Sequence, residues 1–160
     1  MPAITYAKPD SSVTIPAKDH PNCCAAVAIA VATGKSFSES FDIVAAKSDN
    51  FVRGKGTSKL DFSQIANELG FSGVPIEEYG VPKRVQPEYF KKAGILIRNN
   101  PTLNMIVNLV QYGRYIVVTR DHVAAIIDGV LVDTWESLGT DGRRKIERLY
   151  FLDNSVTSIK

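Results

Sequence analysis

The apolar residues of the chain follow helical spacing in its first part. A run from Cys23 to Ala32, preceded by Asn22 as a candidate N-cap and followed by Gly34, predicts a helix that is apolar on every side and therefore buried. Ser36 with Glu39 three residues later is a capping box, which predicts the start of a second helix.

Two further helices are predicted downstream. Residues 60–69 are apolar at helical intervals and end at Gly70, and Asn100-Pro101 supplies a cap and a first-turn proline for a helix over 103–110. The intervening residues 71–92, which hold three prolines, do not match the pattern of a helix or a strand.

Two segments are predicted to be irregular. Residues 1–20 contain three prolines and several hydroxyl side chains, so we expect an extended arm with at most a short strand. Residues 49–57 predict a glycine-bearing loop.

Beyond Gly113 the chain changes to short β-branched and aromatic segments separated by turn residues. Asp128-Gly129 between two of them is a strong hairpin signal. We therefore expect an α+β fold in one domain over residues 1–160, with N-terminal helices packed on a C-terminal antiparallel sheet. The predicted strands are Arg114–Thr119, His122–Ile127, Val130–Asp133 and Ile146–Leu152.

The hairpin turn places specific side chains opposite one another. With Asp128-Gly129 as a two-residue turn, Ala124 lies opposite Asp133 and His122 opposite Trp135. All four side chains then share one face of the sheet, and the Asp133 carboxylate comes within reach of the His122 imidazole. Such a carboxylate fixes the imidazole tautomer.

Cys24 lies in the first turn of the predicted buried helix, where unpaired backbone N–H groups favour a thiolate. If the His122 face of the sheet packs against this helix end, then Cys24, His122 and Asp133 form a nucleophile, a base and an orienting carboxylate. Each residue also has a structural interpretation, as a core thiol, a hydrogen-bonded histidine and a turn carboxylate.

The composition excludes some classes of protein. With 44% hydrophobic and 22% charged residues the chain is neither disordered nor fibrous. A net charge of +2 does not indicate a polyanion-binding surface, so nucleic acid is not the expected partner. The basic cluster 143–145 is interpreted as a solvated hairpin tip, and a nucleic-acid contact there remains an alternative.

The two cysteines, Cys23 and Cys24, are adjacent, and no zinc-like spacing accompanies the two histidines. We expect free thiols in a reducing compartment and no metal ion or cofactor. Residues 1–10 lack a signal-peptide pattern, and the longest apolar run is about half of a membrane span. A cytoplasmic location without membrane association is therefore expected.

Two segments resemble a known family. NCCAAVAIAVATGKSFSESFD, from Asn22, and GRYIVVTRDHVAAIIDGVLVDTWES, from Gly113, resemble phage and bacterial papain-like cysteine peptidases of the C39-like branch. The resemblance implies a papain-like fold, a peptide or protein substrate, and a catalytic triad of Cys24, His122 and Asp133. It implies cleavage of a peptide, isopeptide or amide bond.

The sequence departs from the family at one position. These peptidases place a glutamine shortly before the cysteine to bind the oxyanion, and residues 17–22 contain none. Asn22, His20 or the Cys24 backbone N–H are the candidates for that role, and Trp135 is a candidate shield of the triad. The alternative is a catalytically silent binding module, phage-encoded and acting on a host or defence protein in the host cytoplasm. The sequence does not define an oligomeric state.

Overall fold

The computed structural model describes residues 6–18, 20, 22–52, 56–75, 102–109, 113–119, 122–133 and 146–152. These residues form helices and a sheet in the α+β class. The helices are α1 (Ser11–Ala17), α2 (Cys24–Thr33), α3 (Phe37–Lys47), α4 (Asp49–Val52), α5 (Lys59–Glu68) and α7 (Leu103–Leu109). The strands are β1 (Tyr6–Ala7), β2 (Phe71–Pro75), β3 (Arg114–Thr119), β4 (Val123–Ile127), β5 (Val130–Val132) and β6 (Ile146–Leu152).

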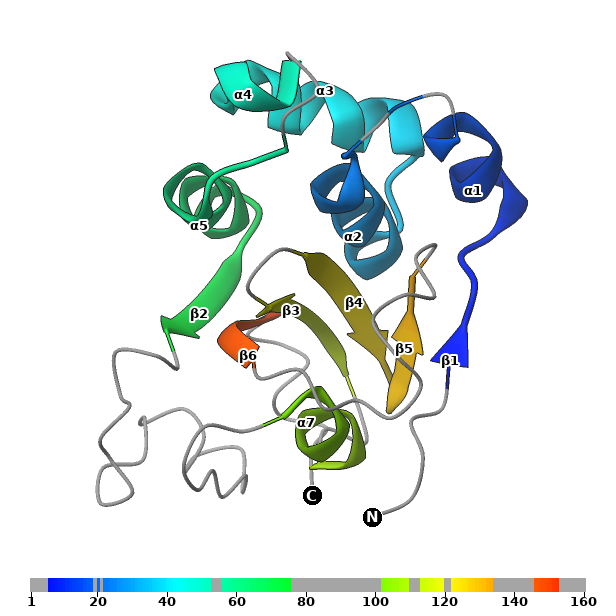
Figure 1. The fold of residues 1–160 in the computed structure, drawn as a ribbon, viewed down its shortest axis with the longest axis vertical. Coiled ribbons are helices and arrows are strands. Elements are labelled where there is room, and N and C mark those ends of the chain that lie inside the picture. The colour runs from blue at the N-terminus through cyan, green and yellow to red at the C-terminus, as the bar shows by residue number, and fades with distance from the viewer. Residues whose placement is uncertain are drawn as a thin grey trace.

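The described strands form one sheet in the order β1-β5-β4-β3-β6-β2. The β2, β3, β4, β5 and β6 pairings are antiparallel, and β1 joins the edge of the sheet parallel to β5. The sheet therefore combines a local meander of β3, β4 and β5 with the C-terminal strand β6, and β1 and β2 form its two edges (Figure 1).

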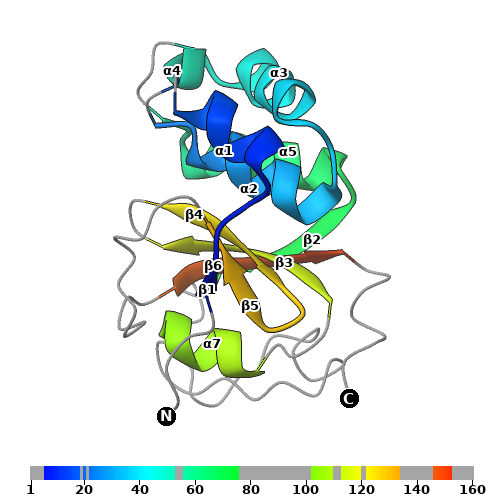
Figure 2. The same cartoon turned by 90° about the vertical axis from the view of Figure 1, so that its right-hand side faces the viewer.

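The helices lie on both faces of this sheet. Helices α1 to α5 form a layer on one side, and α7 covers the other side (Figure 2). The central member of the helical layer is α2, which contacts β4 and β3 on one side and α3 and α1 on the other. Because α2 is enclosed in this way, seven of its ten residues are buried.

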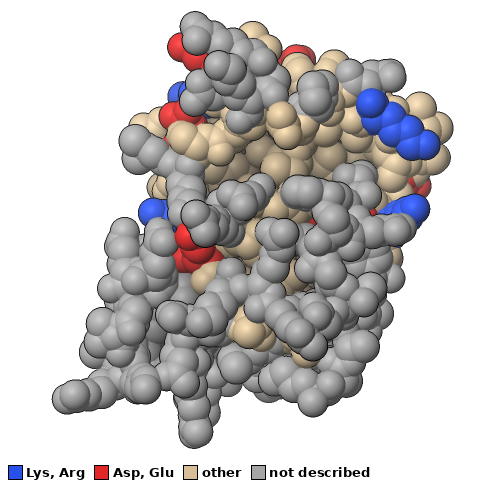
Figure 3. All heavy atoms as spheres, in the orientation of Figure 1, with Lys and Arg blue, Asp and Glu red and all other residues tan. Residues whose placement is uncertain are grey.

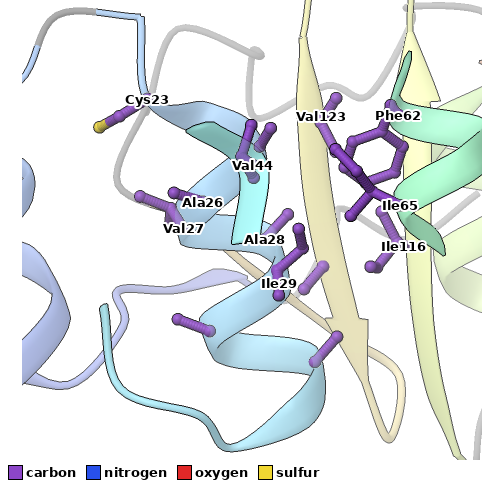
Figure 4. Packing of buried hydrophobic residues seen from close by; sticks show 14 of the residues in the cluster. Cys23, Ala26, Val27, Ala28, Ile29, Val44, Phe62, Ile65, Ile116 and Val123 are labelled. Carbon is purple, nitrogen blue, oxygen red and sulfur yellow. The ribbon is translucent and has the colours of Figure 1, made fainter. Parts of the chain in front are cut away.

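A hydrophobic core cluster joins the helical layer to the face of the sheet that α2 covers. It contains Ile116 and Val118 of β3 and Val123 and Ala125 of β4, together with most of α2. Figure 4 shows α2 and β4 side by side, with Cys23 and Val123 at the same end. The N-terminus of α2 therefore lies beside the start of β4.

Several predicted elements are confirmed. Gly34 ends α2 in the left-handed conformation with φ 77°, and Ser36 caps α3 by accepting a hydrogen bond from the Glu39 N–H at 3.1 Å. The helix predicted over 60–69 is α5, which is followed by Gly70 with φ 87°. Part of the helix predicted over 103–110 is α7, and its predicted Asn100-Pro101 cap lies outside the described residues.

Two local predictions are wrong, and the structure adds a strand in a segment for which the sequence makes no assignment. The supposed extended arm contains α1, because the Asp10 side chain caps it and Pro16 stands near its end, where a missing N–H removes only one bond of the helix. The predicted loop over 49–57 contains α4, whose Phe51 is buried. The segment 71–92 begins with β2, which is paired to β6 from the far end of the chain.

The described helices include none that is both long and apolar enough to cross a membrane. On the face of the molecule in Figure 3, the described Lys and Arg side chains form separate groups near the margins.

Candidate active site

The β4–β5 hairpin has the turn and register that the sequence predicts. Asp128 and Gly129 have φ values of 48° and 81°, as a tight hairpin turn of the primed type requires. The Asp128 carboxylate also accepts a hydrogen bond from the Gly113 N–H at 2.8 Å, which ties the turn to the start of β3. Ile127 pairs with Val130, and continuing this register places Ala124 opposite Asp133.

His122 and Asp133 lie just beyond the strands predicted to contain them. His122 precedes β4, and its carbonyl accepts a hydrogen bond from the Thr119 N–H at 2.9 Å. Asp133 follows β5, and its N–H donates to the Ala7 carbonyl at 3.1 Å. The backbone of each residue is therefore held by a neighbouring strand, and nothing in the sequence around Ala7 signals its supporting role.

The two side chains meet in the interior. His122 Nε2 lies 2.5 Å from Asp133 Oδ2, and both residues are buried, at 4% and 1% exposed. A carboxylate accepts only, so the Nε2–H donates and Nδ1 is the nitrogen left for another partner. The predicted contact between imidazole and carboxylate is confirmed.

The sequence predicts that the sheet face carrying His122 packs against the start of α2, and this part of the prediction is wrong. The sheet face that α2 covers carries Val123 and Ala125, so strand alternation puts Ala124 on the opposite face. His122 and Asp133 reach the end of α2 because they lie beyond the ends of their strands, where alternation no longer sets the direction of a side chain. The site is thus at an end of the sheet.

Cys24 is the first residue of α2. The N-cap is Cys23, not Asn22 as predicted, and the Cys23 side chain accepts no capping hydrogen bond. Asn22 instead has a left-handed φ of 55° and directs the chain into the helix. The first intrahelical bond runs from the Val27 N–H to the Cys23 carbonyl at 3.1 Å, so the amides of the first turn lie outside the helical ladder.

The environment of the His122 ring includes the Cys24 thiol. Burial lowers the pKa of His122, whereas side-chain hydrogen bonds to Asp133 and Cys24, with the charges of both partners, raise it more, and the resulting pKa is about 9. Because Nε2 is hydrogen-bonded to Asp133, an interaction of the ring with Cys24 would involve Nδ1. The three predicted residues therefore converge.

Cys23 has a different environment. Its Sγ donates to the Ala17 carbonyl at 3.6 Å, the residue is 8% exposed, and its side chain points away from the strands (Figure 4). Burial raises the pKa of the Cys23 thiol, and the charge of Cys24 adds to this rise. Both cysteines are free thiols, as expected, and Cys24 is the more exposed of the two.

The other candidate residues are His20, which contacts α3, and residues that lie outside the described part of the chain. The exposed His20 packs its ring on Phe41 and Phe37, at centroid distances of 4.6 and 5.8 Å. Its aromatic contacts are thus with α3. Trp135 and the basic cluster 143–145 lie outside the described residues.

A buried carboxylate that orients an imidazole, which in turn exchanges a proton with a thiol, is the arrangement of a nucleophile with its general base. Within the described parts of the chain, no group of three His, Cys, Asp or Glu side chains is arranged to hold a metal ion. The arrangement of a nucleophile with its general base can support acyl transfer through a thioester.

No family model matches the chain, and neither do the curated proteins or the solved structures with which it was compared.

Proposed function

We propose that this protein is a papain-like cysteine hydrolase that cleaves a peptide, isopeptide or amide bond. The convergence of Cys24, His122 and Asp133 is the observation that carries the proposal. A buried helix that begins at the nucleophile and packs on an antiparallel sheet bearing the base and the orienting carboxylate agrees with a papain-like fold.

Acylation follows from the arrangement of the three side chains. In the reactive form the Cys24 thiol has passed its proton to His122 Nδ1, and the pKa of about 9 keeps that proton on the imidazole at neutral pH. Cys24 Sγ attacks the carbonyl carbon, a C–S bond forms, and the carbonyl π electrons move to oxygen. When the C–N bond breaks, the His122 proton passes to the leaving nitrogen.

Deacylation reverses the role of the imidazole. Neutral His122 removes a proton from water, the resulting hydroxide attacks the thioester, and the acid leaves as the thiol is restored. An amine in place of water would give transfer. Asp133 holds the Nε2–H throughout, so Nδ1 is the nitrogen that takes up and releases the proton.

The backbone N–H of Cys24, at the start of α2, is the candidate donor to the oxyanion. The Cys24 amide belongs to the first turn of this helix and lies outside its hydrogen-bond ladder, so it is available to a developing negative charge. Since residues 17–22 hold no glutamine, we expect slower catalysis than in an enzyme with a side-chain donor, by about 10²–10³.

The proposal is tested with p-nitrophenyl acetate, which acylates reactive thiols. We expect a burst of p-nitrophenol and a single acetyl group on Cys24, found by mass spectrometry of peptides. Cys23→Ser serves as the matched control and keeps the burst, Cys24→Ala abolishes it, and His122→Ala slows it by about 10²–10⁴. Acetylation of Cys23 instead, or a burst that survives Cys24→Ala, would contradict the proposal.

The second candidate is a catalytically silent binding module of the same fold. The missing glutamine in residues 17–22 favours it. In a phage-encoded protein the partner would be a host or defence protein in the host cytoplasm. This candidate predicts that no acyl group forms on folded protein and that a purified partner binds the wild type and Cys24→Ser equally.

A further inference from the structure

A cleft opens between the segment after β1 and the side of α1. It has a volume of about 480 Å³, within the range of roughly 300–1,000 Å³ usual for ligand pockets. Its lining residues are Lys8, Pro9, Ser11, Thr14, Ala17 and Lys18. Pro9 and Ala17 are buried and form its apolar wall.

The polar lining comes mainly from one side of α1. Ser11, Thr14 and Lys18 are spaced by three and four residues, so they lie along one face of the helix, and Lys8 comes from the preceding segment. Two hydroxyl groups that can donate and two ammonium groups thus border an apolar wall. This combination suits the carboxylate and the methylene groups of an acidic side chain.

The segments that border this cleft also contact residues of the candidate active site. Ala17 accepts the hydrogen bond from Cys23 Sγ, and Cys23 directly precedes Cys24. Ala7, next to Lys8, accepts the hydrogen bond from the Asp133 N–H. The segments that border the cleft therefore contact Asp133 and the residue that precedes Cys24.

Among the residues that the structure describes, the charged side chains that line the cleft are the basic side chains of Lys8 and Lys18. The nearby Asp10 carboxylate accepts a hydrogen bond from the Ser12 N–H at 2.9 Å and is engaged in capping α1.

We propose that this cleft is a specificity subsite that binds an acidic side chain of the peptide substrate beside the bond to be cleaved. The inference rests on the proposed function, because it places the peptide next to Cys24. Exposed charge pairs contribute little individually, so each lysine should account for about a two- to five-fold preference.

The experiment measures how short peptide mixtures slow the alkylation of Cys24 by iodoacetamide. In each mixture one position is fixed as Glu, Gln or Lys and the others are varied. We expect the Glu mixtures to protect best, Lys8→Gln and Lys18→Gln to weaken that protection two- to five-fold each, and the preference to decline with added salt. Lys35→Gln, a lysine outside the cleft lining, is the matched control and should change nothing.

Equal protection by Glu, Gln and Lys mixtures, or no protection by any of them, would overturn the subsite. Loss of protection in Lys35→Gln to the same extent as in Lys8→Gln would overturn it too. The proposed function is judged separately in the same assay without peptide, by whether the alkylation rate depends on His122.

Discussion

Cys23 and Cys24 are adjacent in the sequence, yet their side chains have different environments. Cys23 is the N-cap of α2, turned toward the Ala17 carbonyl, whereas Cys24 is the first helical residue and interacts with the His122 ring. The difference comes from the left-handed Asn22 and the start of the helix, which aim successive side chains in different directions. The sequence indicates Cys24 through its position at a helix start, but only the fold reveals what Cys23 does.

At this scale we predict the titration of the His122 imidazole by NMR. The wild type should titrate near pH 9, and Asp133→Asn should lower the pKa of His122 because the carboxylate charge is lost while burial still disfavours the imidazolium. His20→Gln assigns the signals, since the chain has two histidines. A His122 signal that still titrates near pH 9 in Asp133→Asn would show that Asp133 does not raise this pKa.

The same shift predicts the basic limit of catalysis. Because the leaving nitrogen takes its proton from His122, acyl transfer from an amide substrate should decline as pH rises through about 9. Asp133→Asn should move this decline to lower pH. A decline at the same pH in both proteins, measured as kcat/KM, would assign it to another group.

Among the elements, the β4–β5 hairpin controls the geometry of the site. Its turn fixes the register that carries Asp133 to the start of β4, and a slip by one residue would reverse every side chain of β5. Local signals of this kind, namely turns, caps and stop glycines, were enough to predict α2, α3, α5 and most strands. They were insufficient for β2, whose partner β6 is remote in sequence, and for the short helix α1.

For this element we predict the effect of Asp128→Ala on unfolding by urea. Alanine is disfavoured at φ 48° and cannot accept the hydrogen bond from Gly113, so the free energy of unfolding should fall by about 1–2 kcal/mol. Asp128→Asn is the matched control, because asparagine tolerates this conformation and retains an acceptor oxygen. Equal losses in the two variants would mean that the turn is not held by these features.

A second prediction concerns the capping of α3. Ser36→Ala removes the oxygen that accepts the Glu39 N–H and should reduce the free energy of unfolding by about 1 kcal/mol. Ser38→Ala, an exposed position within the same helix, should cause no loss, because alanine is the better helix former. A smaller loss for Ser36→Ala than for Ser38→Ala would contradict the assigned cap.

In the molecule as a whole, the candidate site forms where the helical layer meets one end of the sheet. The convergence requires that the start of α2, the start of β4 and the end of β5 lie close together. No local sequence pattern encodes this arrangement. The sequence therefore predicts the three residues and the hairpin but places the side chains on the wrong face of the sheet. The reason is that the alternation of side chains along a strand does not continue past the end of the strand.

Global stability should reflect the buried pair of His122 and Asp133. The folded-state pKa of about 9 exceeds the usual value of 6.5, so this pair stabilises the fold fully below about pH 6.5 and progressively less as pH rises through 9. Urea unfolding should thus show a decrease in stability over this range that is smaller in Asp133→Asn. The same decrease in both proteins would assign it to other titrating groups.

The central claim is that Cys24 and His122 act as one reactive unit. The most direct test is the rate at which iodoacetamide alkylates Cys24 at about pH 6. At this pH a free thiol, with a pKa of about 8.5, is almost fully protonated. We predict that Cys24 in Cys23→Ser reacts faster than a free thiol and that His122→Ala reduces the rate to that of a free thiol. A Cys24 that reacts no faster than a free thiol, or one unaffected by His122→Ala, would contradict the account.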